Sequence, residues 1–162
     1  MGYSRTRIGE SPVSLEDLKA WNYIEDDIFD GKLTVCLHSA IAAAETYTNQ
    51  TFWSSLYTLD VAAGFREISV PLYPITKVEV FSDGEPLPSS RWSFDGSTVK
   101  VDSSVSGPVS IEVMAGRETI DPDVKAAILL VASELFRNPT DSVRTLPSSS
   151  QLLLQSHRHA SV

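Results

Sequence analysis

The spacing of apolar residues changes twice along this chain, and this change constrains its fold more than any other feature. Between Ser14 and Asn49 apolar residues recur at helical spacing, whereas from Thr51 β-branched and aromatic residues alternate with polar ones between Gly, Pro and Asp. Helical spacing returns at Asp121. The pattern predicts a β unit, residues 51–116, between two helical segments.

Capping residues and periodicity predict three helices. The first begins at Ser14, whose hydroxyl stands three residues before an acid, and it is short. The third begins at Asp121-Pro122-Asp123, an N-cap followed by proline and an acid, and ends near Asn138-Pro139, because proline cannot continue a helix. The second runs from about residue 27 or 30 to about residue 49 along one apolar stripe: Leu33, Leu37, Ala40, Ile41, Ala44 and Tyr47.

The middle of the chain is predicted to form antiparallel strands joined by hairpins. Ser82-Asp83-Gly84 and Asp95-Gly96 are strong turn signals. The strands are expected near residues 56–61, 66–70, 76–81, 92–94, 98–101 and 109–114. The predicted fold class is α+β: a mostly helical bundle of three main helices and a C-terminal tail helix, with a small inserted antiparallel β unit.

Both ends of the chain are predicted to need a partner. Residues 1–13 are interpreted as an N-terminal arm, loose in isolation, because the first ten residues have no periodic apolar pattern. Residues 14–138 form a single domain in this interpretation, with helices within 14–50, the β unit at 51–116 and a helix at 121–138. Residues 139–162 are a polar linker and a tail, whose three leucines at 152–154 predict a helix too short to be stable alone.

The charge balance excludes several classes of function. The 162 residues contain 13 Lys and Arg against 21 Asp and Glu, a net charge of −8. This charge argues against a DNA-binding protein, because such proteins neutralise phosphates with Lys and Arg. The last 21 residues contain no acid.

No apolar run reaches the roughly 18 residues of a membrane span, and the N-terminus lacks a signal-peptide pattern, so we expect a soluble protein made in the cytoplasm. The single cysteine, Cys36, excludes an intrachain disulfide.

The residue patterns favour a structural or binding protein over an enzyme. The sequence has no nucleophile-elbow and no phosphate-loop motif, and we expect no cofactor and no metal. His157 and His159 are interpreted as part of a solvated or partner-contacting tail. The alternative is a small soluble α+β hydrolase or carbohydrate-binding domain that uses Glu79 and Glu112, a carboxylate pair on neighbouring strands.

The order of these segments resembles the head–tail connector (adaptor, or head-completion) proteins of long-tailed bacteriophages. Four segments carry the resemblance: SLEDLK at 14–19 with the acidic break at 25–30, AIAAAETYTN at 40–49, VPLYPITKV at 70–78, and the strand-to-helix step at 113–116 with IDPDVKAAI at 120–128 and LFRN at 135–138. Residues 138–149 depart from the family pattern, and residues 156–162 have no counterpart in it.

The resemblance implies a non-enzymatic ring of copies, usually twelve on the virion. Such a ring stacks between the portal protein and the next neck or tail-completion protein, and DNA passes through it without specific binding or any membrane contact. The protein would act in the virion neck and reside in the host cytoplasm during assembly. Acidic walls would repel DNA, so we expect some of Glu16, Glu25, Asp26, Asp27 and Asp30 to line the channel. Family members contact the portal through the C-terminal segment, which implies a portal-binding role for Ser150, Gln151, Leu152, Leu153, Leu154 and Arg158.

Overall fold

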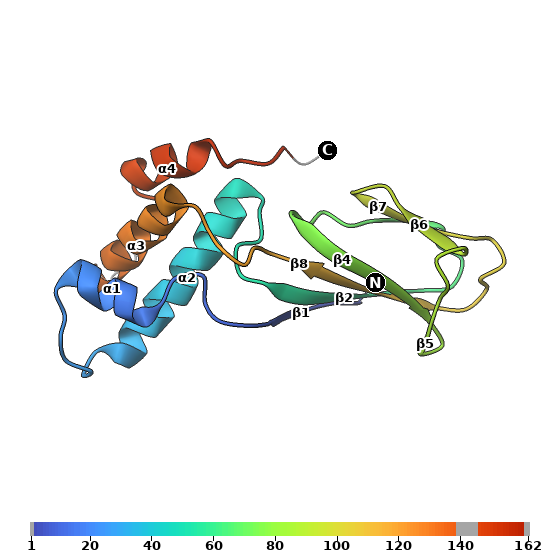
Figure 1. The fold of residues 1–162 in the computed structure, drawn as a ribbon, viewed down its shortest axis with the longest axis horizontal. Coiled ribbons are helices and arrows are strands. Elements are labelled where there is room, and N and C mark those ends of the chain that lie inside the picture. The colour runs from blue at the N-terminus through green and yellow to red at the C-terminus, as the bar shows by residue number, and fades with distance from the viewer. Residues whose placement is uncertain (1, 139–145, 161–162) are drawn as a thin grey trace. The chain divides into compact units, whose positions relative to one another are not determined.

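The computed structural model describes residues 2–138 and 146–160, and it divides the chain into two compact units (Figure 1). The sheet unit comprises Met1–Gly9 and Ser54–Arg117, and the helical unit comprises Glu10–Trp53 and Glu118–Val162. Most of the predicted linker lies outside the described residues. Among the described residues, no helix is long and apolar enough to cross a membrane.

The sheet unit contains two antiparallel sheets. Both follow the alternation of apolar and polar residues, since β2 (Ser55–Val61) and β8 (Val109–Ala115) of the larger sheet and β7 (Thr98–Val101) of the smaller sheet each bury every second residue. The smaller sheet has the order β3 (Glu67–Ser69), β7 (Thr98–Val101) and β6 (Trp92–Phe94). The larger has the order β1 (Gly2–Arg7), β2 (Ser55–Val61), β8 (Val109–Ala115), β4 (Ile75–Ser82) and β5 (Glu85–Pro86).

One hydrophobic core joins the two sheets. Tyr57 of β2 is the register partner of Val113 of β8, and both side chains are buried in it. The smaller sheet contributes Ile68 and Val99 to the same core. Residues at alternate positions, such as Thr58 and Glu112, lie on the other face of the larger sheet, which is therefore only partly covered.

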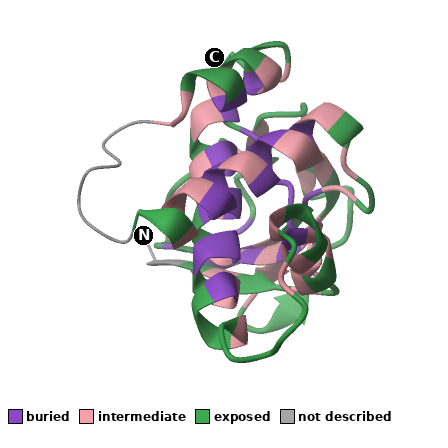
Figure 2. Cartoon of the chain, turned by 90° about the vertical axis from the view of Figure 1, so that its left-hand side faces the viewer, coloured by how far each residue is buried: buried purple, intermediate pink, exposed green. Residues whose placement is uncertain are grey.

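The helical unit contains four helices around a second core: α1 (Leu15–Asn22), α2 (Asp30–Thr48), α3 (Pro122–Arg137) and α4 (Ser148–Gln155). Figure 2 shows the buried residues on the inward sides of these helices. The predicted stripe of α2 is confirmed, because Leu33, Leu37, Ala40, Ile41 and Ala44 are all buried. Val124, Ile128 and Val131 of α3 pack in the same core.

The predicted start of α1 is confirmed in atomic detail. Ser14 Oγ accepts a hydrogen bond from Asp17 N, and the Asp17 carboxylate accepts one from Ser14 N, which is a complete capping box. Asp17 also forms an ion pair with Lys125 of α3, at 2.8 Å. The hydrogen bond from Lys125 lowers the pKa of Asp17. The capping box thus also links α1 to α3.

The prediction of a mostly helical bundle with a small β inset is wrong. The described residues contain four helices and eight strands in two antiparallel sheets, and the strands form a unit with a core of its own. The six predicted strands begin and end within two residues of the corresponding strands in the structure. The error has a physical cause: short strands with alternating residues do not reveal that β3, β6 and β7 form a second sheet and bury one side of the first.

The prediction that the first residues are loose is also wrong. Residues 2–7 form β1, which pairs with β2 along its whole length. Arg5 Nε donates a hydrogen bond to Ser55 Oγ at 3.0 Å, and its guanidinium lies 5.4 Å from the Tyr57 ring centroid. The partner that orders this segment is therefore another strand of the same chain.

Candidate functional site

The C-terminal helix α4 packs against α3, so the predicted portal-binding residues face different ways. Ser150 and Leu154 are fully buried, as expected for residues four apart on one helix face, and Leu153 packs partly into the same core. Leu152 points to solvent, with 72 % of its surface exposed. Gln151 Nε2 donates a hydrogen bond to the Leu146 carbonyl at 2.7 Å. The tail helix, which was predicted to need a partner, therefore packs against α3 of its own chain.

The segment after α4, residues 156–160, runs over the C-terminal end of α2. His159 N donates to the Thr48 carbonyl at 2.8 Å, and Asn49 Nδ2 donates to the His159 carbonyl at 3.2 Å. The Arg158 guanidinium, the last predicted portal-binding group, lies 5.3 Å from the Tyr47 ring centroid. These contacts cap the last turn of α2, where a helix has carbonyls without partners of its own.

His157 lies between two carboxylates at the start of α3. Its Nε2 is 2.8 Å from Asp123 Oδ2, and its Nδ1 is 3.7 Å from Asp121 Oδ2. The hydrogen bond with His157 lowers the pKa of Asp123. The three side chains bring possible metal-ligand atoms within 4.8 Å of one another. However, the two ring nitrogens face different carboxylates, which is the geometry of a side chain hydrogen-bonded to Asp123 and close to Asp121.

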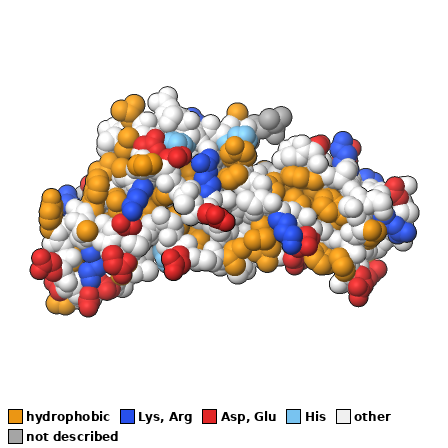
Figure 3. All heavy atoms as spheres, viewed as in Figure 1, with side chains coloured by type: hydrophobic (Ala, Val, Ile, Leu, Met, Phe, Trp, Pro, Cys, Tyr) orange, Lys and Arg blue, Asp and Glu red, His pale blue; other side chains and the backbone are white. Residues whose placement is uncertain are grey.

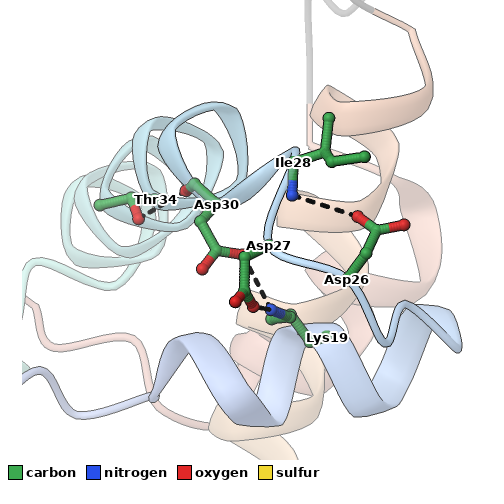
Figure 4. Close-up of polar contacts among 6 residues, drawn as sticks. All are labelled: Lys19, Asp26, Asp27, Ile28, Asp30 and Thr34. Carbon is green, nitrogen blue, oxygen red and sulfur yellow. Dashed lines mark hydrogen bonds and ion pairs between the residues drawn. The ribbon is translucent and has the colours of Figure 1, made fainter.

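The predicted acidic residues at the α1–α2 turn are partly neutralised by one lysine (Figure 4). Lys19 Nζ is 2.5 Å from Asp27 Oδ1 and 2.9 Å from Asp30 Oδ1. This lysine lowers the pKa of Asp27 through a hydrogen bond, and the two carboxylates raise the pKa of Lys19. Asp26 accepts a hydrogen bond from Ile28 N, which holds the turn. Three carboxylates and one ammonium therefore carry a net charge of −2.

Glu16 and Glu25, the two other predicted channel residues, are exposed. The structure does not gather all five acids at one point: Glu16 lies on α1, whereas Glu25, Asp26 and Asp27 lie in the turn and Asp30 begins α2. The five predicted acids are therefore spread along one end of the helical unit and do not form one cluster.

The same end of the helical unit also carries exposed apolar side chains that were not predicted from the sequence. Tyr23 is 94 % exposed, Ile28 is 82 % exposed, and Trp21, at the end of α1, is 44 % exposed. Figure 3 shows apolar and acidic side chains intermixed at this end of the helical unit. The available signal was composition, since a connector rich in acids also held Tyr23, Ile28 and Phe29. Trp21 and Tyr23 border a shallow groove that is otherwise lined by Asp17, Ala20, Pro122, Lys125, Ala126 and Leu129.

The carboxylate pair of the alternative hypothesis lies on the less covered face of the larger sheet. Glu79 of β4 and Glu112 of β8 are register partners. The Glu79 carboxylate is 2.9 Å from Lys77 Nζ, and its side chain is 47 % exposed. Glycosidase carboxylates act across a bound sugar in a site that controls access of water. The surface around Glu79 offers a solvated ion pair instead.

The chain's cysteine is a packing residue in this structure. Cys36 is buried in α2, and burial raises the pKa of its thiol. A buried cysteine with a raised pKa is chemically inert, because the thiolate is the reactive form.

No family model and no curated protein matches the chain. Solved structures do match along nearly its full length. A chain in the neck of an empty GTA particle, computed with C6 symmetry, is 17 % identical, with a TM-score of 0.72 over 98 % of this chain and 97 % of that one. A chain in the virion of a native gene transfer agent (GTA) particle is also 17 % identical, with a TM-score of 0.72 over 98 % and 96 %. A chain in the neck of a native GTA particle, computed with C12 symmetry, is 19 % identical, with a TM-score of 0.68 over 98 % and 97 %.

These matches define the class of fold: over 98 % of its length, the fold of this chain is similar to that of chains from the necks of GTA particles. At 17–19 % identity the likeness is one of fold. It agrees with the resemblance to head–tail connector proteins that the order of segments in the sequence indicated.

Proposed function

We propose that this protein is a structural, non-enzymatic component of a virion neck, where copies of the chain form a ring. The observation that carries the proposal is the structural match to neck chains, which spans 98 % of this chain and 97 % of the chain it matches. Those necks were computed with C6 and C12 symmetry, which supports a ring of six or twelve copies. A cyclic ring requires two different surfaces of each chain to meet.

In this proposal the ring lies beneath the portal protein, completes the head after DNA packaging, and joins it to the next neck or tail protein. The overall charge of −8 suits a channel that DNA passes without binding. Glu16, Glu25 and Asp26 would repel DNA most strongly if this end of the helical unit faces the channel, because Lys19 offsets Asp27 and Asp30.

The C-terminal segment 150–158 is the proposed portal contact. Leu152 is the residue to test first, because its side chain is exposed and its replacement leaves the core intact. A deletion from residue 151 onward would also remove the buried Leu154, so a loss of portal binding could not be distinguished from a loss of core packing.

The experiment mixes the purified protein with the purified portal ring of the same particle and images the product by electron microscopy. The wild type is expected to form a ring stacked on the portal, and Leu152→Asp is expected to weaken this complex at least tenfold. Phe65→Asp, which adds the same charge at a position 61 % exposed in the sheet unit, is the matched control and is expected to bind normally. Absence of a wild-type complex at micromolar concentrations, with both proteins folded, would refute the portal contact.

A further inference from the structure

The segment after α4 makes contacts that point to a restraint on the C-terminal helix. We propose that residues 156–160 form a clasp that holds α4 against α2 and α3 in the free protein, and that a binding partner must displace this clasp to bind all three leucines of α4. The inference rests on the proposed function, because it assumes that the C-terminal segment is the contact to the portal.

The first half of the clasp attaches to the end of α2. Asn49, the C-cap of α2, has a left-handed backbone with φ of 54°, and its side chain donates to the His159 carbonyl. Gln50 Nε2 donates to the His157 carbonyl, and His159 N donates to the Thr48 carbonyl. Three hydrogen bonds therefore join His157 and His159 to three consecutive residues, 48–50, at the C-terminal end of α2.

The second half of the clasp attaches to the start of α3. His157 contacts Asp123 through Nε2 and faces Asp121 through Nδ1, and its side chain is only 17 % exposed. Asp121 is the N-cap of α3, but its side chain makes no capping hydrogen bond there. The acidic motif that begins α3 thus serves to hold His157. The neighbouring Arg158 lies over Tyr47 of α2, so this segment contacts side chains of both helices.

The clasp controls whether α4 stays packed against α2 and α3, because α4 itself buries few residues. An eight-residue helix is not stable alone in water. Its buried residues are Ser150 and Leu154. The clasp contacts are polar and lie near the surface, so they can break while α2 and α3, of 19 and 16 residues, keep their shared core.

The docked and released forms present different surfaces to a partner. In the docked form Leu154 is hidden against α3 and Leu152 is exposed. In the released form all three leucines and the cationic Arg158 become available together. This combination fits a partner with an apolar groove and an acidic rim. The docked state therefore competes with the partner, and binding must supply the free energy of release.

The test compares three full-length variants. His157→Asp places a third carboxylate beside Asp121 and Asp123, and Gln50→Ala removes the donor to the His157 carbonyl. Gln155→Ala, at an exposed position of α4, is the matched control. Hydrogen exchange measured by mass spectrometry is expected to rise at least tenfold across residues 148–160 in the first two variants, with α2 and α3 still protected. Unchanged exchange in both variants would overturn the clasp.

Portal binding is then measured for the same proteins. If the clasp restrains docking, His157→Asp and Gln50→Ala bind the portal ring severalfold more tightly than the wild type, while Gln155→Ala binds equally. Faster exchange combined with weaker or equal binding would show that the docked form is the binding form, which overturns the restraint. If no protein binds, wild type included, the proposed portal contact fails, whereas the exchange data still decide whether the segment is a clasp.

Discussion

The carboxylate of Glu45 in α2 accepts a hydrogen bond from the backbone N–H of Phe52 at 2.9 Å, seven residues further along the chain. The same oxygen accepts a second from Trp53 N at 3.0 Å. Glu45 is only 8 % exposed, and both donors lie in the buried segment that follows α2. One acid thus satisfies two backbone groups that no regular element would pair, and it fixes where the chain leaves the helical unit.

We expect Glu45→Ala to lower the free energy of unfolding by about 3 kcal/mol, because it leaves two buried N–H groups without an acceptor. Glu45→Gln keeps an oxygen acceptor and is expected to cost less, about 1 kcal/mol. Urea denaturation followed by tryptophan fluorescence measures both. Thr46→Ala, at the next and exposed position, is the control. Equal stability of Glu45→Ala and Thr46→Ala would contradict this role for Glu45.

The packing of α4 gives a second prediction. Leu154→Ala is expected to cost about 3 kcal/mol, because the side chain is fully buried and its removal leaves a cavity. Leu152→Ala is expected to change stability by less than about 0.5 kcal/mol, since an exposed residue loses little. Thermal unfolding of the two variants checks the difference. A Leu154→Ala protein as stable as the wild type would mean that α4 does not dock in solution.

The His157–Asp123 contact gives a prediction for pH. The pKa of Asp123 is lowered from its usual value by the hydrogen bond with His157. The contact therefore stabilises the fold above the ordinary carboxyl pKa of about 3.9, and this stabilisation is lost as the pH falls through the lowered pKa. Asp123→Asn is expected to flatten the dependence of stability on pH in this acid range. Urea unfolding from pH 5 down to pH 2 makes the comparison, and parallel curves for the two proteins would refute the contribution of Asp123.

The residues that set local geometry could be recognised from the sequence. Ser14 and Asp17 form the capping box that their spacing indicated, and Asp95-Gly96 lies between β6 and β7 as its turn chemistry required. The edge strand β1 could not be recognised in the same way. Its polar residues show no apolar alternation, and its order comes from pairing with β2, some fifty residues away.

The candidate site was harder to predict, because its residues act through contacts that are remote in sequence. Leu152 and Leu154 are the same type of residue, yet the position of α3 leaves Leu152 exposed and Leu154 buried. Ser150 is polar and still fully buried, with its hydroxyl 3.4 Å from the Ala127 carbonyl. Lys19 reaches Asp27 and Asp30 only because the chain turns between α1 and α2. No local pattern encodes these three outcomes.

The last prediction separates the structural role of the larger sheet from catalysis. Glu79 and Glu112 are register partners on neighbouring strands, and like charges in that position repel each other. Glu112→Lys replaces the repulsion by an attraction to Glu79, so it is expected to raise the free energy of unfolding by about 0.5 kcal/mol. Ser69→Lys, which introduces the same charge on β3 opposite the uncharged Thr98, is the control for a general effect of charge.

Urea denaturation at low and high salt measures the change, and the gain is expected to shrink as salt screens the pair. Carboxylates kept for catalysis behave differently, because replacing one abolishes turnover. An activity screen against glycosides and esters in which the wild type turns over a substrate and Glu112→Gln does not would favour the hydrolase alternative. A more stable Glu112→Lys protein that still forms a ring on the portal would show that the sheet needs neither carboxylate for its function.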